Sequence, residues 1–189
     1  MNFTKTKIEG LVIIEPSVYP DERGFFMESY SKKVFVENGI DVEFVQDNHS
    51  RSTKGVLRGL HFQKPPFAQD KLVRCSKGEV LDVAVDIRIN SPTFGQYESV
   101  LLTEENKTMF FISKGFAHGF LVLSDIADFQ YKCSNFYNKE SEGGLLWNDP
   151  EINIDWNVRA DLVSDSQFIL SEKDKLWPTL AEIKNLDFF

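Results

Sequence analysis

The sequence has only two cysteines, Cys75 and Cys133, among 189 residues. A small disulfide-stabilised domain would need more, so both thiols are expected to be reduced core side chains. A catalytic thiol is disfavoured, because neither cysteine lies in a motif that would lower its pKa. This cysteine usage is typical of a protein that stays in the cytoplasm.

Long apolar segments are also missing. No run approaches the ~20 apolar residues that a membrane-spanning helix needs. The first ten residues contain lysines but no apolar stretch like that of a signal peptide. We therefore expect a cytoplasmic protein with no membrane partner.

Positive charge is scarce as well. The chain has 21 Lys and Arg against 29 Asp and Glu, which gives a formal net charge of −8. General nucleic-acid binding requires a basic face, so no nucleic-acid partner is expected. An acidic protein can still bind an anion through a local cluster, such as Arg58 with Lys71.

The sequence is rich in short apolar segments separated by turns. Its 17 phenylalanines, together with many Val and Ile, favour strands with aromatic packing. Strands at this spacing predict an all-β barrel or sandwich. We predict strands at 11–15, 25–30, 43–49, 58–63, 71–75, 79–88, 97–102, 108–112, 119–123, 127–133 and 144–147.

Two of these strands, 71–75 and 79–88, are expected to pair as a hairpin across 76–78. The second alternates, with Leu81, Val83, Val85 and Ile87 on one face. The polar segment 50–55 is predicted to be a loop.

Two short helices complete the expected elements. One covers 32–38, where Ser31 can cap it, and the other covers 178–186. The chain is predicted to be one domain, 1–189, in which about 157–189 forms an extension packed on the barrel.

One apolar strand carries more polar chemistry than a core strand needs. It contains Arg58, His61 and the candidate substrate-binding residue Gln63, and Lys71 follows soon after. Strict alternation would place Arg58 and His61 on opposite faces. If both reach one site, the strand must kink or bulge near Gly59. A plain core strand with a hydrogen-bonded histidine remains the alternative.

Two glycine–histidine spacings resemble the motifs of the cupin family. Five residues separate Gly55 from His61, and two residues separate Gly115 from His118. The resemblance implies a double-stranded β-helix, that is, a cupin or jelly-roll barrel, with short helices, one of them at the C-terminus.

The cupin metal site uses two His and a Glu from its first motif and one His from its second. Here Gln63 stands at the second His position, and 68–72 contains no Glu. His61 and His118 fall short of the three strong ligands that a catalytic metal needs. We therefore predict no metal and no cofactor, which disfavours a metal-dependent cupin oxygenase.

Without a metal, the chemistry must depend on proton transfer. His61 is the best candidate base, because histidine titrates near physiological pH. Tyr131 is the candidate acid, because alternation places it on the apolar face of 127–133. Lys71 and Arg58 could hold an oxyanion. A hydrogen-bonded core tyrosine and a solvated lysine are the alternatives.

Taken together, six segments resemble the dTDP-4-dehydrorhamnose 3,5-epimerase family in the family's order, over about residues 8–175. The resemblance implies a metal-free isomerase of L-rhamnose biosynthesis, serving cell-surface polysaccharide. It would convert dTDP-4-dehydro-6-deoxy-D-glucose into dTDP-4-dehydro-L-rhamnose. The segments are 44–50, 55–61, 71–75, 82–88, 115–120 and 147–150.

The resemblance also implies roles for individual residues. The family's base matches His61, its orienting aspartate Asp174 and its acid Tyr131. Its members are homodimers in which an N-terminal strand joins the partner's sheet, so some substrate contacts are expected to come from the neighbouring chain. The substrate-binding positions match Arg23, Glu28, Gln46, Asp47, Asn48, Arg58, Lys71, His118, Glu142 and Lys173.

Three other functions remain open at this stage. A C3-only epimerase would share the same motifs, and a sugar 3,4-ketoisomerase would share the fold. A non-catalytic sugar-nucleotide binding module would bind the ligand and exchange no protons.

The thymine could stack on Phe25, Phe26 or Tyr137, and the sequence does not choose among them.

Overall fold

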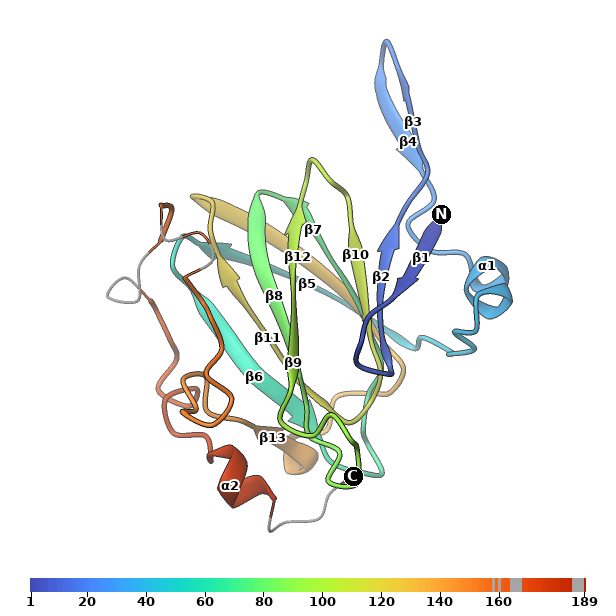
Figure 1. The fold of residues 1–189 in the computed structure, drawn as a ribbon. Helices are drawn as coiled ribbons and strands as arrows, with labels where there is room; N and C mark the ends of the chain where they lie inside the picture. The colour runs from blue at the N-terminus through green and yellow to red at the C-terminus, as the bar shows by residue number, and fades with distance from the viewer. Residues whose placement is uncertain (158, 160, 164–167, 185–188) are drawn as a thin grey trace.

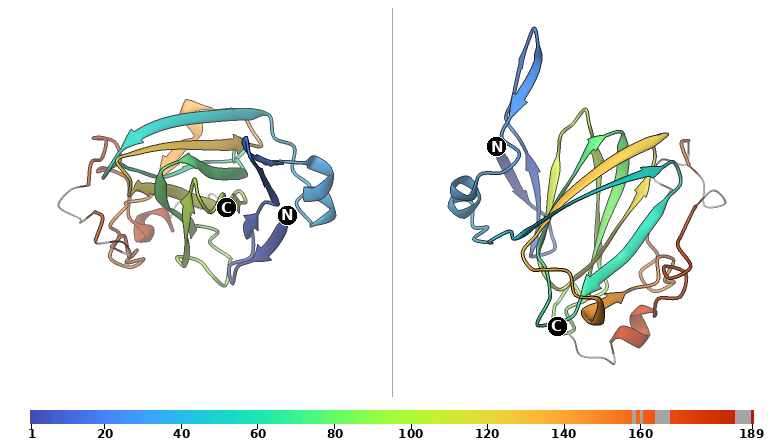
Figure 2. Two further views of the ribbon diagram at one scale, coloured as in Figure 1. Left: turned by 90° about the horizontal axis from the view of Figure 1, so that it is seen from above. Right: turned by 180° about the vertical axis from the view of Figure 1, so that it is seen from behind.

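The computed structural model describes residues 1–157, 159, 161–163, 168–184 and 189. Most of the strands form two antiparallel sheets that face each other, and a two-stranded hairpin lies apart from them (Figures 1 and 2). The predicted all-β, jelly-roll class is therefore confirmed. The larger sheet contains, in spatial order, β1 (Asn2–Lys5), β2 (Leu11–Glu15), β10 (Met109–Ile112), β7 (Lys71–Lys77), β12 (Ile126–Cys133) and β5 (Gln46–Thr53).

The smaller sheet carries the segment that the sequence singled out. Its strands are, in spatial order, β13 (Glu142–Gly144), β6 (Leu57–Gln63), β11 (Phe116–Val122), β8 (Glu79–Asp86) and β9 (Tyr97–Thr103). The remaining elements are the hairpin β3 (Val18–Asp21) and β4 (Gly24–Met27), helix α1 (Lys32–Glu37), the 3₁₀ turn η1 (Lys139–Ser141) and helix α2 (Leu180–Ile183). No helix among the described residues is long and apolar enough to cross a membrane.

Apolar side chains from both sheets meet in the space between them. Phe110 and Phe129 of the larger sheet pack there with Phe120 and Val122 of the smaller sheet. A second cluster covers the outer face of the smaller sheet, where Trp156 and other residues of the C-terminal segment pack. Both faces of the smaller sheet are thus covered, which fixes its strands for a site built on β6 and β11.

The predicted hairpin between 71–75 and 79–88 is wrong. β7 lies in the larger sheet and β8 in the smaller one, so the chain crosses between sheets at Gly78. Val73 of β7 and Val80 of β8 pack in the same inter-sheet cluster. The two strands face each other across the core, and a pattern of alternating apolar residues does not distinguish this from pairing side by side.

The predicted loop at 50–55 is also wrong over most of its length. β5 continues to Thr53, and Ser52 pairs with Ala127 of β12. The inward side chains of β5 are polar because they border a cavity, so the strand lacks the apolar alternation on which the prediction relied.

Smaller corrections concern the element ends. Strands β1 and β3 were not predicted, and β4 ends at Met27, short of the expected 25–30. The expected strand at 144–147 is shifted to β13. Ser31 is the N-cap residue of α1, but its side chain makes no capping hydrogen bond. The expected helix over 178–186 is α2, and its expected end at Leu186 lies outside the described residues.

The expected bulge near Gly59 is confirmed. His118 of β11 pairs with His61 and Phe120 pairs with Arg58, so two residues of β6 oppose Gly119 alone. Gly59 has a φ of +125°, and a Cβ built there would lie 2.6 Å from the Cα of Gly119. Only glycine fits both constraints.

Replacing Gly59 by alanine should therefore destabilise the protein strongly. We expect the free energy of unfolding to fall by about 3 kcal/mol or more, because backbone strain and overpacking each cost roughly 1–3 kcal/mol. Gly39→Ala is the matched control: its φ is +85°, and a Cβ there meets nothing within 4 Å. The control should lose only about 1–2 kcal/mol. Equal losses in urea denaturation would show that the close approach at Gly119 is unimportant.

Candidate active site

A cavity between the sheets is divided into two adjoining chambers, and His61, Lys71 and Tyr131 line both. The first, which we call the amide chamber, has a volume of about 120 Å³ and is also lined by Gln46, Asn48, Phe62, Gln63, Gln69, Cys133, Tyr137 and Glu142. The second, the aromatic chamber, has a volume of about 140 Å³ and is also lined by Ser50, Arg58, His118, Gly119, Phe120 and Phe129.

His61 forms a short pair with a buried carboxylate. Its Nε2 lies 2.5 Å from Oδ1 of Asp174, which is only 4% exposed. Burial works against ionisation of Asp174, but hydrogen bonds from His61, Ser171 and Trp177 hold the pKa of this carboxyl below its ordinary value. With Nε2–H donated to Asp174, the Nδ1 atom of His61 is left to accept a proton.

Replacing Asp174 by asparagine should lower kcat by about 10²–10⁴, because the amide no longer fixes the tautomer of His61.

The lowered pKa of Asp174 also predicts how the stability of the protein depends on pH. The ionised carboxylate of Asp174 stabilises the folded state fully at pH values above its ordinary pKa of 3.8. This stabilisation disappears as the pH falls through the lowered pKa of the folded state. The stability gap between wild type and Asp174→Asn should therefore narrow below about pH 4. Urea denaturation at pH 7 and pH 3 measures this difference in the free energy of unfolding. A difference that is the same at both pH values would contradict an ionised Asp174 in the folded state.

Lys71 and Tyr131 enter the cavity from neighbouring strands of the larger sheet, β7 and β12. Burial lowers the pKa of Lys71, and the carboxylate of Asp82 acts in the opposite direction. Burial raises the pKa of Tyr131, and the nearby Arg58 opposes this shift. Tyr131 is therefore a neutral phenol at pH 7 and has a proton to give.

A second histidine–aspartate pair lies under the aromatic chamber. Nε2 of His118 is 2.9 and 3.0 Å from the two carboxylate oxygens of Asp82. Burial lowers the pKa of His118, while Asp82 opposes the shift. Asp82 is fully buried within β8. No role was predicted for it, although a carboxylate inside a buried apolar strand was the available signal.

The bulge at Gly59 brings Arg58 into the aromatic chamber together with His61. Nε of Arg58 donates to the hydroxyl of Ser52 at 3.0 Å, which holds the guanidinium against β5. The alternating pattern of β6 alone would have placed Arg58 on the opposite face from His61.

In the amide chamber, the side-chain amides of Gln46 and Gln63 form hydrogen bonds within the protein. Gln46 donates to Asn48 at 3.0 Å and accepts from the backbone N–H of Tyr137. Nε2 of Gln63 donates to the carbonyls of Phe67 and Phe136, and its Oε1 accepts from the N–H of residue 138. Gln63 therefore holds two loops together and has no amide proton left for a ligand.

A family model and several known proteins match this chain. Residues 5–182 match the family model described as dTDP-4-dehydrorhamnose 3,5-epimerase. This chain belongs to the dTDP-4-dehydrorhamnose 3,5-epimerase family. The predicted family and enzyme class, an isomerase, are confirmed.

Individual relatives of this epimerase chain are similar over nearly its whole length. The dTDP-4-dehydrorhamnose 3,5-epimerase of Shigella flexneri is 62% identical over 166 residues, which cover 87% of this chain and 92% of the relative. The Escherichia coli K12 enzyme of the same name is 56% identical over 187 residues, 98% of each chain. A solved Legionella pneumophila dTDP-6-deoxy-D-glucose-3,5-epimerase, in complex with dTDP-4-keto-L-rhamnose, is 52% identical with a TM-score of 0.89 and covers 96% of each chain.

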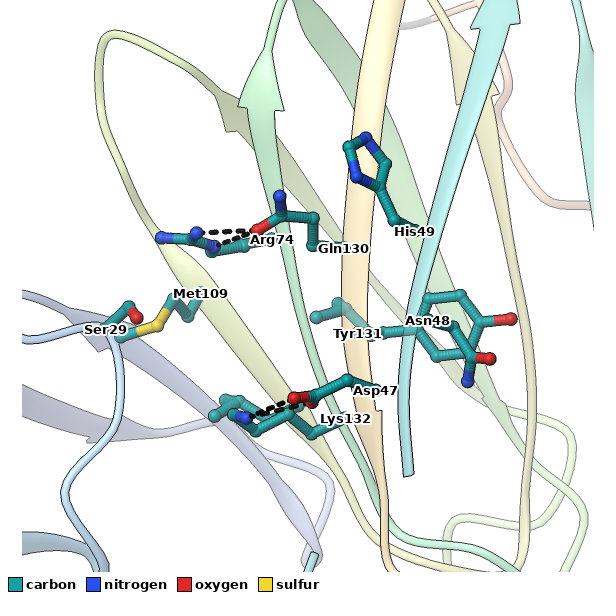
Figure 3. A pocket seen from close by; sticks show the side chains of 11 residues that line it. Ser29, Asp47, Asn48, His49, Arg74, Met109, Gln130, Tyr131 and Lys132 are labelled. Carbon is teal, nitrogen blue, oxygen red and sulfur yellow. Dashed lines mark hydrogen bonds and ion pairs between the residues drawn. The ribbon is translucent and has the colours of Figure 1, made fainter. Parts of the chain in front are cut away.

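Four predicted substrate-binding residues of this epimerase lie outside both chambers, namely Arg23, Glu28, Asp47 and Lys173. Arg23 and Glu28 are exposed in and after the β3–β4 hairpin, which projects away from the sheets (Figure 1). Asp47 lies on the outer face of β5 and pairs with Lys132 at 2.8 Å (Figure 3). In the same view, the side chains of Asn48 and Tyr131 point away from that pair.

Glu142 and Lys173 form an ion pair at the edge of the amide chamber. The hydroxyl of Tyr137 also donates to Glu142, at 3.2 Å. Trp177, to which the sequence assigned no role, donates its indole N–H to Asp174 at 3.1 Å and lies under the ammonium group of Lys173. An aromatic residue three positions after Asp174 was too weak a signal to predict this contact.

Within the described part of the epimerase, no group of three or more His, Cys, Asp and Glu side chains is placed to hold a metal ion. The two cavity histidines instead pair with carboxylates, Asp174 and Asp82. The donors in the cavity are thus arranged for proton transfer and hydrogen bonding.

Proposed function

We propose that this protein inverts C3 and C5 of dTDP-4-dehydro-6-deoxy-D-glucose and so forms dTDP-4-dehydro-L-rhamnose for L-rhamnose biosynthesis. The observation that carries the proposal is that His61, Lys71 and Tyr131 line both chambers, with Asp174 bound behind His61. A base, an acid and a cation at one cavity are the groups that this reaction requires.

The substrate's own chemistry defines the steps. The 4-keto group acidifies the hydrogens on C3 and C5, and removal of either proton places negative charge on the C4 oxygen. His61 takes the proton, and the ionised Asp174 stabilises the imidazolium that forms. The bond broken is C–H, and the electron pair moves into the enolate.

The two sheets supply the two faces of this reaction. His61 belongs to β6 of the smaller sheet, and Tyr131 belongs to β12 of the larger one. A sugar ring between the sheets would meet the base on one side and the acid on the other. Proton removal by His61 and proton delivery by Tyr131 would then invert the carbon.

The enolate oxygen needs a positive partner. Lys71 and Arg58 both line the aromatic chamber, and we assign the C4 oxygen to them. A positioned oxyanion donor is worth about 3–4 kcal/mol in the transition state. Burial destabilises the charged form of Lys71, so the negative charge that develops on the C4 oxygen would stabilise this ammonium group.

We also propose that the functional unit is a homodimer. Tyr19, Phe25 and Phe26 on the β3–β4 hairpin are 62%, 57% and 66% exposed, and the hairpin forms a two-stranded sheet of its own. A partner chain would cover these rings and receive Arg23 and Glu28 near its pyrophosphate site, where a planar guanidinium suits phosphate oxygens. Light scattering measures the oligomeric state, and a monomer that retains full activity would contradict this assembly.

Product stereochemistry tests the proposed reaction. The purified protein is incubated with dTDP-4-dehydro-6-deoxy-D-glucose, the keto group is reduced with borohydride and the sugar is released for chiral chromatography. Double inversion yields L-rhamnose and its C4 epimer. Inversion at C3 alone yields 6-deoxy-D-allose and its C4 epimer, and unchanged substrate yields 6-deoxy-D-glucose and D-fucose. Either of the last two results would overturn the proposal.

A further inference from the structure

The inner face of β5 is unusual for a strand of a β-sandwich. Its inward side chains are Gln46, Asn48, Ser50 and Ser52, all polar, while the intervening residues are exposed. Inner faces of packed sheets normally carry apolar side chains. Gln46 and Asn48 line the amide chamber and Ser50 lines the aromatic chamber, so this face of β5 forms a wall of the cavity.

Three of these four side chains already have protein partners. Gln46 donates to Asn48 at 3.0 Å, Asn48 contacts the sulfur of Cys133 at 3.6 Å, and Ser52 accepts from Arg58. The hydroxyl oxygen of Ser50 is buried and has no hydrogen-bond partner in the described structure. No other side-chain nitrogen or oxygen among the described residues shares this condition.

An unpartnered buried hydroxyl costs free energy, so its presence calls for an explanation. Ser50 pairs with Phe129 in the register of β5 and β12 and lines the aromatic chamber with Arg58, His61 and Lys71. A ligand oxygen in this chamber would supply the missing partner.

We propose that Ser50 is a sugar-binding residue. Its hydroxyl forms a hydrogen bond with an oxygen of the hexose ring, and this oxygen lies beside the reacting carbons. This inference rests on the proposed function. The chamber matches a 6-deoxy sugar, because it combines the polar Ser50 and Arg58 with the stacked rings of Phe120 and Phe129, whose centroids are 4.1 Å apart. A hydroxyl suits a neutral ring oxygen, whereas a pyrophosphate calls for cations.

Ser50→Ala tests the proposal through two readouts that should move differently. We expect kcat/KM to fall about 3- to 30-fold, the range expected for one lost hydrogen bond to the substrate. The melting temperature of the free protein should stay the same or rise, because the variant breaks no bond within the protein. Affinity for dTDP alone, measured by calorimetry, should be unchanged, because that ligand lacks the sugar.

Ser76→Ala is the matched control. The hydroxyl of Ser76 donates to the carbonyl of Asp128 at 3.3 Å on the exposed part of β7, outside both chambers. This variant should keep the wild-type kcat/KM and dTDP affinity, and its melting temperature should not rise.

Two results would overturn the role of Ser50 while the wild type remains active. One is an unchanged kcat/KM in Ser50→Ala. The other is a melting temperature that falls together with dTDP affinity, which would make the hydroxyl structural. A wild-type protein that leaves the substrate unchanged would instead refute the proposed function and, with it, the assignment of Ser50.

Discussion

Replacing His61 by asparagine is expected to lower kcat by about 10²–10⁴ while nucleotide-sugar binding persists. A positioned base contributes this much to a rate, and asparagine has no group that accepts the substrate proton near pH 7. The carboxylate of Asp174 also accepts the indole N–H of Trp177 at 3.1 Å, so it keeps a partner in the variant and the fold should remain intact. Turnover at saturating substrate and calorimetric binding measure the two expectations separately.

His49 offers the same chemical change outside the cavity. It lies on the outer face of β5 near Asp128, and its side chain is 55% exposed. His49→Asn should therefore retain wild-type turnover. If His61→Asn kept more than about a tenth of wild-type kcat, another base would have to be sought.

Replacing Tyr131 by phenylalanine should separate the two halves of the reaction. Proton removal by His61 does not require the phenol, whereas delivery of a proton to the opposite face does. In D₂O, we expect exchange at the acidic carbons to continue while inversion falls by about 10²–10⁴. Comparing deuterium content with product stereochemistry in the same sample gives both rates.

Tyr97→Phe is the control for the loss of a phenolic hydroxyl. The Tyr97 oxygen accepts from the backbone N–H of Asp155, away from both chambers. This variant should exchange and invert like the wild type. An equal loss of exchange and inversion in Tyr131→Phe would argue against its role as the acid.

Local sequence chemistry was sufficient for the bulge in β6. Arg58 and His61 could share one site only if strand alternation failed between them, and Gly59 was the residue that permits such a failure. The observed register has this form. The all-β class was likewise accessible, because strand lengths and turn residues are local properties. The jelly-roll arrangement was expected only from the resemblance to the cupin motifs.

Sheet membership was less accessible from the sequence. Whether β7 and β8 pair side by side or face each other depends on packing of Val73 and Val80 from both strands, and alternation is the same in either case. The second half of β5, from Ser50 to Thr53, was predicted to be a loop for a related reason. The partners of Ser52 and of its neighbours lie on distant strands, so a cavity wall is invisible until the strands are assembled.

Deuterium incorporation by the wild-type protein is the sharpest test of proton transfer by His61 and Tyr131. The protein is mixed with dTDP-4-dehydro-6-deoxy-D-glucose in D₂O, with and without a chelator, and proton NMR follows the C3 and C5 signals. Both proton signals should disappear at rates that the chelator does not change, because His61 and Tyr131 move the protons. Binding without exchange, or exchange that the chelator abolishes, would contradict this mechanism.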